Sequence, residues 1–333
     1  MTAMNKIIVI AAGGEYPRLL VEGARRAGVA TVDVMAVKGS CERATMRAAD
    51  HVFPFAVSES DKAIRWTAEQ GYDGAVLAGQ VSPLSLFRGK FGPVVLGWLR
   101  EMPVKNAHTI FGKLVSEFEK AGVRMIPASS YMDDNLPGAG VLTKRGLTDL
   151  EKTDVERGFQ VAADVGRHDV GQTVLVKAGM VLAVEAFEGT NAAIKRAGKL
   201  GRGSVLCKAA REGHDWRFDI PVVGLKTLKN MKKAGVTALA FQAGRLLLLD
   251  REKVVDFADR NNIAIVGVES GLPPAPTRPR SRAHQNDVSR GEMRVAFAAK
   301  IAFSPATENS PSASVHTRAT SSMLCASDER VTA

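Results

Sequence analysis

The chain has 333 residues, of which 45% are apolar, 24% are charged and three are widely spaced cysteines. This length predicts about two domains, and cysteines without a C-x-x-C pair exclude a disulfide framework and a structural zinc site. The formal net charge is +10, which favours an anionic partner, either a small molecule or a membrane surface. The basic residues form no long blocks and only 6% of the residues are aromatic, so a nucleic-acid-binding surface is excluded.

The first 130 residues alternate short β-branched runs with amphipathic helical patterns. Strands are predicted at 6–12, 29–37 and 75–78, and helices at 17–28, 60–70 and 107–121. Strands that alternate with helices form parallel βαβ units. We therefore expect an α/β fold in which residues 1–130 are an N-terminal Rossmann-like domain with a parallel sheet.

The remaining residues divide into three regions. Residues 131–147 are rich in Ser, Asp, Asn, Pro and Gly, which predicts a linker. Residues 148–270 are expected to form a C-terminal α/β domain with a mixed sheet. Two hairpins are predicted there, one from 173–176 to 181–186 and one from 239–241 to 246–249. Residues 271–333 lack periodicity, and we expect them to be a disordered tail.

Two predicted strands of the first domain end in glycine turns. Gly13 and Gly14 precede a helix, where backbone amides favour an anion, although many such turns carry glycine for packing alone. The third glycine of the dinucleotide fingerprint is missing and Asp33 lies inside its strand, so dinucleotide binding is disfavoured. Gly79 and Gln80 either face the same crevice or form an ordinary polar turn.

Polar residues cluster near the predicted strand ends of the second domain. In chain order they are Gln172, Glu185, Glu188, Thr190 and Lys208. The segment DWRFD follows, and a strand there would place Asp215, Arg217 and Asp219 on one face. Two carboxylates that flank an arginine can hold a divalent metal, position a water or form a solvated salt bridge. The residues by themselves leave these alternatives open.

Long motifs in this region resemble the LpxI family of UDP-2,3-diacylglucosamine pyrophosphatases. The motifs lie at 164–197, with VLAVEAFEGT, and at 208–250, with RFDIPVVG, and the resemblance covers roughly residues 5–270. It implies hydrolysis of the nucleotide-sugar diphosphate at the α-phosphorus, giving UMP and 2,3-diacylglucosamine 1-phosphate in lipid A biosynthesis. It also implies a divalent cation such as Mg²⁺, substrate binding between two domains, and residues 148–270 as the catalytic domain.

The resemblance also implies roles for individual residues. Asp219, which precedes an Ile-Pro pair, matches the family's essential catalytic aspartate. Mg²⁺ often takes only one or two protein carboxylates, so Asp219 with Glu185, or with Glu188, is the expected metal-binding pair. Cleavage of a diphosphate also needs groups that neutralise its oxygens. The expected substrate-binding residues are Gly13, Gly14, Gly79, Gln80, Gln172, Glu188, Thr190, Lys208 and Arg217.

The chain departs from the family pattern at two places. Ala12 stands where the family's turn usually has the first of three glycines. Ala107 and His108 stand where many members carry two acids. The second departure motivates an alternative function, a nucleotide or nucleotide-sugar binding protein that does not hydrolyse its ligand.

The absence of a long apolar run bears on location and partners. No run approaches the roughly 18 residues that a membrane-spanning helix needs, so we expect a cytoplasmic protein. Because the expected substrate is an acylated UDP-sugar, we also expect at most a peripheral, salt-sensitive association of the protein with the inner membrane. We expect no nucleic-acid partner, and the sequence leaves homo-oligomerisation open.

Overall fold

The computed structural model describes residues 4–80, 92–213 and 215–270, which all lie in one compact unit, Met1–Ser281. The predicted tail at 271–333 lies outside the described residues, as does the segment 81–91 that follows Gln80. Two main sheets organise the described part of the chain, with a two-stranded sheet beside them.

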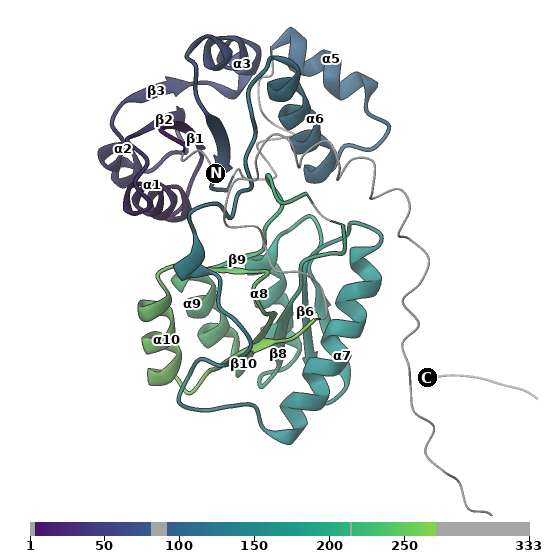
Figure 1. Cartoon of the computed structure of the whole chain (residues 1–333). Coiled ribbons are helices and arrows are strands. Elements are labelled where there is room, and N and C mark those ends of the chain that lie inside the picture. The colour runs from purple at the N-terminus through teal and green to yellow at the C-terminus, as the bar shows by residue number, and fades with distance from the viewer. Residues whose placement is uncertain (1–3, 81–91, 214, 271–333) are drawn as a thin grey trace, which may run out of the picture. The chain divides into compact units, whose positions relative to one another are not determined.

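The first sheet is entirely parallel, as the sequence predicts, with the strand order β3-β2-β1-β4 (Figure 1). Its strands are β1 (Lys6–Ala11), β2 (Thr31–Val37), β3 (Val52–Phe55) and β4 (Gly74–Ala78). The accompanying helices are α1 (Tyr16–Arg26), α2 (Arg43–Ala48), α3 (Ser60–Glu69), α5 (Pro93–Glu101) and α6 (Ala107–Lys120), with a 3₁₀ turn at Val57–Glu59. The structure therefore confirms a parallel α/β architecture in the N-terminal part.

Alternation along β1 sends side chains into two separate cores. Ile7 and Val9 pack with the apolar residues of α1, whereas Ile8 and Ile10 pack with those of α3 and α6. All four side chains are buried. Helices therefore cover both faces of the sheet, as a parallel sheet built from βαβ units requires.

The second sheet is mixed, with the strand order β5-β12-β10-β8-β6-β7. Its strands are β5 (Gly140–Val141), β6 (Thr173–Lys177), β7 (Met180–Val184), β8 (Val205–Lys208), β10 (Ala238–Gln242) and β12 (Ala264–Val268). Neighbours among β8, β10 and β12 are parallel, and the other pairs are antiparallel. The predicted mixed sheet and the predicted hairpin of β6 and β7 are both confirmed.

Helices also cover both faces of the second sheet. They are α7 (Asp149–Gly166), α8 (Thr190–Leu200), α9 (Leu225–Ala234) and α10 (Arg251–Arg260), and a 3₁₀ turn lies at Asp133–Asn135. Val155 of α7 packs with Cys207 in one core, whereas Ile194 of α8 and Leu228 of α9 pack with Leu206 in another. Because neighbouring residues of β8 enter different cores, this strand is buried on both faces.

One local prediction is wrong, and one arrangement that the sequence left open is excluded. The segments 239–241 and 246–249 do not form a hairpin, because β10 pairs with β8 and β12. The second segment instead contains β11 (Leu247–Leu248), which pairs in parallel with β9 (Val222–Val223). DWRFD is not a strand either, because the Asp215 carboxylate accepts the backbone amide of Arg217 and the Asp219 amide donates to the Asp215 carbonyl. Such local side-chain bonds favour a turn over a strand.

A buried ion pair anchors the start of α7. The Glu151 carboxylate accepts hydrogen bonds from Arg145 at 2.8 and 2.9 Å and from the Thr237 hydroxyl at 2.7 Å. Burial by itself would raise the pKa of Glu151, but Arg145, the Thr148 amide and Thr237 lower it to about 2. The folded state thus binds this proton more weakly than the unfolded chain does.

We expect Glu151→Gln to lower the free energy of unfolding at pH 7 by roughly 1–3 kcal/mol, because hydrogen bonds to a charged group are lost. The wild-type contribution is complete above the ordinary carboxyl pKa and is lost as the pH falls toward about 2. Urea unfolding at pH 7 and in the range from pH 5 to 3 measures both effects, with the exposed Glu156→Gln on the same helix as control. The account would be contradicted if the difference in the free energy of unfolding between wild type and Glu151→Gln did not decrease from pH 5 to pH 3.

Candidate active site

The glycine turns of the first sheet meet at the carboxyl ends of β1 and β4. Gly13 and Gln80 form an antiparallel bridge in which each backbone amide donates to the other residue's carbonyl, at 3.2 and 2.9 Å. The Gly13 amide is therefore already engaged. Gly14 has a φ of +94° and Gly79 a φ of +97°, conformations that L side chains rarely adopt. A side chain at Gly79 would also collide with the Gly13 backbone.

A buried lysine lies at the carboxyl end of β8. Lys208 is 4% exposed, and its ammonium donates to the hydroxyls of Thr173 at 3.0 Å and Thr190 at 2.9 Å. Glu185 follows β7, accepts from the Thr190 hydroxyl at 2.9 Å and lies 3.5 Å from the Lys208 ammonium. These four side chains form one connected polar cluster, built from three strand ends and the first residue of α8.

One polar cavity of about 570 Å³ connects the glycine turns with this cluster. Its lining includes nearly all of the predicted substrate-binding residues, namely Gly13, Gly14, Gly79, Gln80, Gln172, Glu188, Thr190 and Lys208, together with Glu185. An adjoining cavity adds Asp219 and shares Gln80, Gln172 and Glu185 with the first. Ligands of open α/β sheets bind at the carboxyl ends of the strands, and Gly13, Gln80, Glu185 and Lys208 lie at or just beyond such ends.

Asp219 lies in a mostly buried position beside two polar partners. Its Oδ1 accepts a hydrogen bond from Gln172 Nε2 at 2.5 Å, and its Oδ2 lies 3.8 Å from Arg211 Nε. Burial raises the pKa of Asp219 above its ordinary value, while the charge of Arg211 and the Gln172 hydrogen bond act in the opposite direction. A carboxylate held in this way can orient a water or hold a cation.

Two predicted binding residues are already paired with other side chains. Arg217 forms ion pairs with Asp215 at 2.5 Å and with Glu119 at 2.6 Å, and it lines neither polar cavity. Glu188 lines the larger cavity, yet it also pairs with Arg196 at 2.6 Å. Burial would raise the pKa of Glu188, but Arg196 lowers it overall. The structure thus brings Glu188 to the cavity and leaves Arg217 outside it.

The smaller cavity is also lined by polar residues to which the sequence analysis gave no role in binding. They are Lys105, Asn106, His108, Asp169 and Arg211. Asp169 lies four residues before β6 and Arg211 lies three residues after β8, and this nearness to strand ends was the available signal. Nothing in the local sequence shows that Asn106 and His108, at the start of α6, would meet them.

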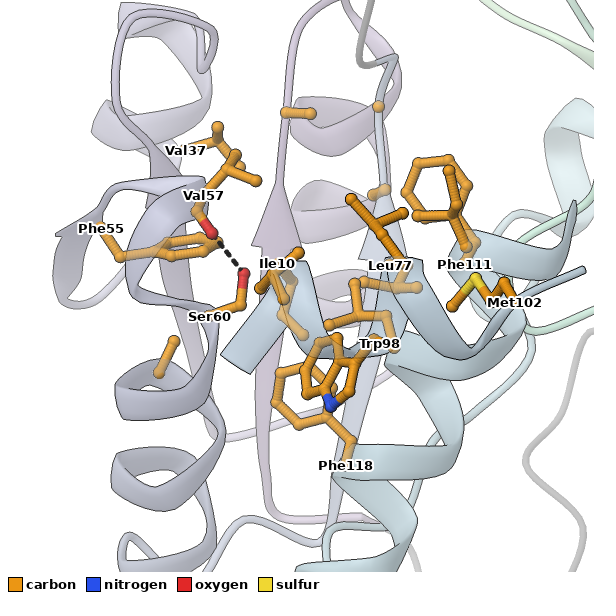
Figure 2. Close-up of a pocket in the computed structure, with 18 residues that line it drawn as sticks. Ile10, Val37, Phe55, Val57, Ser60, Leu77, Trp98, Met102, Phe111 and Phe118 are labelled. Carbon is orange, nitrogen blue, oxygen red and sulfur yellow. Dashed lines mark hydrogen bonds between the residues drawn. The ribbon is translucent and has the colours of Figure 1, made fainter. Parts of the chain in front are cut away.

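An apolar cavity of about 110 Å³ adjoins the glycine turns, and its lining includes Ala12 and Gly79 (Figure 2). Residues of β1, β2, β3 and β4 line it on the side of the sheet, and residues of α3, α5 and α6 line it on the side of the helices. Figure 2 shows Trp98 and Phe118 at one end and Phe111 and Met102 at another. The hydroxyl of Ser60, one of the few polar groups in the lining, donates to a backbone carbonyl within the cavity wall at 2.7 Å.

The apolar cavity and the larger polar cavity share lining residues. Leu77, Gly79 and Phe111 line both. A ligand that reaches from one to the other would place an apolar group against α3, α5 and α6 and a polar group against the Lys208 cluster. The arrangement therefore suits a molecule with a hydrocarbon part joined to an anionic part.

The donors around Asp219 are too few for a metal site made by protein alone. Among the residues that the structure describes, no three His, Cys, Asp or Glu side chains gather as a metal-binding group. Glu185 Oε2 is buried without a hydrogen-bond donor, but the nearby Lys208 ammonium opposes a second cation there. Asp219 faces a cavity and fits a cation that takes its other ligands from substrate and water.

Family models match the chain in two adjacent segments. The LpxI N-terminal domain matches residues 6–135, and the LpxI C-terminal domain matches residues 138–266. A curated relative, the UDP-2,3-diacylglucosamine pyrophosphatase LpxI of Caulobacter vibrioides, is 31% identical over 281 residues, which are 80% of this chain and 98% of the relative. The junction between the two matched segments falls inside the stretch predicted as a linker, 131–147.

Solved structures show weaker likenesses. The biotin carboxylase subunit of pyruvate carboxylase is 13% identical with a TM-score of 0.24, over 56% of this chain and 38% of that structure. The L-amino acid ligase from Bacillus licheniformis is 12% identical with a TM-score of 0.24, over 55% of this chain and 40% of that structure. The chain spans less than half of either one, and likenesses of this size carry no argument about it.

Proposed function

The chain belongs to the LpxI family, and from this premise we propose that it is a hydrolase that splits UDP-2,3-diacylglucosamine into UMP and 2,3-diacylglucosamine 1-phosphate in lipid A biosynthesis. The observation that carries the proposal is the junction of the two cavities at Leu77, Gly79 and Phe111. The diphosphate of such a substrate needs a polar cavity with a cation, and its acyl chains need an apolar one.

Residues of the two polar cavities act on the diphosphate in different ways. Lys208, held by Thr173 and Thr190, offers a fixed positive charge for the phosphoryl oxygens. Gly14 lies before α1, where the helix N-terminus favours an anion. Asp219, oriented by Gln172, is the carboxylate that we assign to catalysis. Positioning and charge neutralisation of this kind account for most of the catalysis of phosphoryl transfer.

A divalent cation such as Mg²⁺ is part of the proposal. Each carboxylate has a cationic neighbour, Lys208 at 3.5 Å from Glu185 and Arg211 at 3.8 Å from Asp219. We assign the divalent cation to Asp219, because the Arg211 contact is the longer one and Asp219 is the more exposed carboxylate, at 22% against 15%. When bound, the cation would neutralise negative charge on the diphosphate oxygens. Mg²⁺ sites often combine one protein carboxylate with phosphate oxygens and water, so a single aspartate is sufficient.

The proposal is tested by comparing two UDP-sugars. The full chain is expected to release UMP from UDP-2,3-diacylglucosamine and to act far more slowly on UDP-N-acetylglucosamine, which lacks the acyl chains. Tight binding of uridine nucleotides without turnover would support the alternative, a binding protein on the same scaffold. In ¹⁸O-labelled water, label in UMP confirms attack at the α-phosphorus, and label in the sugar phosphate contradicts it.

The apolar cavity provides a second prediction. We expect Leu114→Gln to lower kcat/KM for UDP-2,3-diacylglucosamine about tenfold, because the amide would be buried among hydrocarbon where an acyl chain lies. The affinity for UMP should stay unchanged, since UMP does not reach this cavity. The matched control is Leu150→Gln, at a side chain that is 79% exposed. An unchanged kcat/KM for Leu114→Gln would exclude this cavity as the acyl site.

Access to a lipid substrate requires contact with the membrane. No helix in the described part of the chain is long and apolar enough to cross a bilayer. Val94 and Leu96 of α5 are about 40% exposed, on a helix whose Val95, Trp98 and Leu99 line the apolar cavity. We expect sedimentation with anionic vesicles at low salt, and Leu96→Glu should reduce it. Protein that stays on the vesicles after a high-salt wash would contradict this peripheral mode of binding.

A further inference from the structure

A guanidinium group lies among three side chains at the edge of the smaller polar cavity. Arg211 Nη1 is 3.7 Å from Asp169 Oδ1, and Arg211 Nε is 3.8 Å from Asp219 Oδ2. Arg211 Nη2 is 2.8 Å from each ring nitrogen of His108. The three nitrogens of one guanidinium therefore face three different neighbours, and the side chain is only 21% exposed.

The partners of Arg211 are themselves held in place. Asp169 Oδ2 accepts a hydrogen bond from Asn106, whose side-chain oxygen also caps α6 by accepting the Thr109 amide at 2.8 Å. The His108 ring, in the first turn of the same helix, lies 5.3 Å from the ring of Phe218. Arg211 thus contacts groups that are fixed by a helix start, and not side chains that are free to move.

The loop before β6 supplies both Asp169, which contacts Arg211, and Gln172, which contacts Asp219. Asp169 and Gln172 lie three residues apart, and Gln172 donates to the oxygen of Asp219 that Arg211 does not face. Gly171, between them, packs so closely on the Glu185 backbone that any side chain there would collide with it. Asp219 is therefore flanked on two sides: Gln172 donates a hydrogen bond to Oδ1, and Arg211 Nε forms a longer ion pair with Oδ2 without a hydrogen bond.

We propose that Arg211 is a positioning residue of the reaction. Its contacts with Asp169 and His108 fix the guanidinium, and the guanidinium keeps the Asp219 carboxylate in one orientation. The inference rests on the proposed function. The carboxylates of Asp169 and Asp219 share Arg211, and without a positive charge between them they would repel each other. A planar guanidinium can serve several neighbours at once in fixed directions, which a lysine ammonium cannot do.

The kinetic test uses the full chain with UDP-2,3-diacylglucosamine and Mg²⁺. We expect Arg211→Met to lower kcat about 10²-fold with a change in KM of less than about threefold, because the group acts through Asp219 and does not bind substrate. Arg211→Lys should recover part of kcat. The control is Arg167→Met, which removes an arginine 70% exposed and paired with Asp164 at the end of α7, and which should leave kcat unchanged.

A double-mutant cycle separates positioning from independent action. If Arg211 works through Asp219, the kcat of Arg211→Met combined with Asp219→Asn should equal that of Asp219→Asn alone. Two effects that multiply would overturn the proposal. A rise in KM at unchanged kcat would also overturn it, because Arg211 would then be a substrate ligand.

A second readout without substrate keeps this inference separate from the proposed function. The Tm changes of Arg211→Met and Asp219→Asn should not add in the double variant, because the two side chains interact in the folded protein. Additive Tm changes would overturn the coupling even if the enzyme is active. A wild-type chain that hydrolyses no UDP-2,3-diacylglucosamine would overturn the proposed function, while the Tm cycle would still decide whether Arg211 holds Asp219.

Discussion

Asp219→Ala is expected to lower single-turnover hydrolysis by at least about 10²-fold, a loss of about 2.7 kcal/mol of transition-state stabilisation. The carboxylate lines the smaller polar cavity, and Gln172 holds it at 2.5 Å. Removing it costs the orientation of the reacting groups and the proposed contact with the cation. Binding of substrate should survive, because a negative charge near a polyanionic diphosphate is removed at the same time.

Asp215→Ala is the matched control for this prediction. Asp215 lies four residues away in the same turn and is also an aspartate, but it is committed to Arg217 at 2.5 Å. Burial would raise the pKa of Asp215, and Arg217 lowers it overall, so its charge serves this ion pair. Its loss should reduce turnover less than the loss of Asp219. Near wild-type turnover in Asp219→Ala together with an inactive Asp215→Ala would reverse the two assignments.

Lys208→Met is expected to lower the free energy of unfolding by roughly 3–5 kcal/mol, because it leaves the buried Glu185 carboxylate without its positive partner. The Lys208 ammonium also holds the hydroxyls of Thr173 and Thr190, which would lose a donor. Turnover should fall as well, since the fixed charge faces the diphosphate cavity. Urea unfolding at pH 7 measures the first effect, and UMP release measures the second.

A double variant separates the ion pair from simple packing. Glu185→Gln in the Lys208→Met background removes the unpaired charge, so it should restore part of the lost stability. Lys199→Met, at an exposed lysine of α8, should leave stability unchanged. If the double variant is less stable than Lys208→Met alone, the cost of burying an unpaired Glu185 charge is not the cause of the loss.

Much of the fold could be predicted because several strands, among them β1, β2 and β4, are buried on both faces and are separated by periodic helices. The apolar runs of β1, β2 and β4 therefore stand out in the sequence. The second predicted hairpin fails for a reason that lies outside its own residues. Both edges of β10 are already occupied, by β8 and β12, so the following segment pairs with β9 instead.

The candidate site could be predicted where it follows strand ends. Gln80, Gln172, Glu185 and Lys208 all lie beside the end of a strand, and the polar cavities bring them together. Arg217 shows the limit of this reasoning. Its pairing with Glu119 joins residues 98 positions apart and withdraws the guanidinium from the cavity.

The contacts of Arg211 lie at the same limit. His108 meets Arg211 across 103 positions, and no local pattern encodes that contact. The departure of residues 107–108 from the family pattern was visible in the sequence. The consequence of this departure is that the His108 ring contacts Arg211, which in turn faces Asp219. This contact depends on the packing of α6 beside the loop after β8.

The central claim is that one cavity system hydrolyses a lipid-linked UDP-sugar with the help of Asp219 and a divalent cation. The most direct measurement is release of UMP and 2,3-diacylglucosamine 1-phosphate from UDP-2,3-diacylglucosamine by wild type and Asp219→Ala, with Mg²⁺ and with EDTA. The account predicts equal amounts of both products from the wild type with Mg²⁺, and at least about 10²-fold slower release by Asp219→Ala or in EDTA. Turnover by Asp219→Ala at the wild-type rate, or binding of the substrate by the wild type without release of UMP, would contradict it.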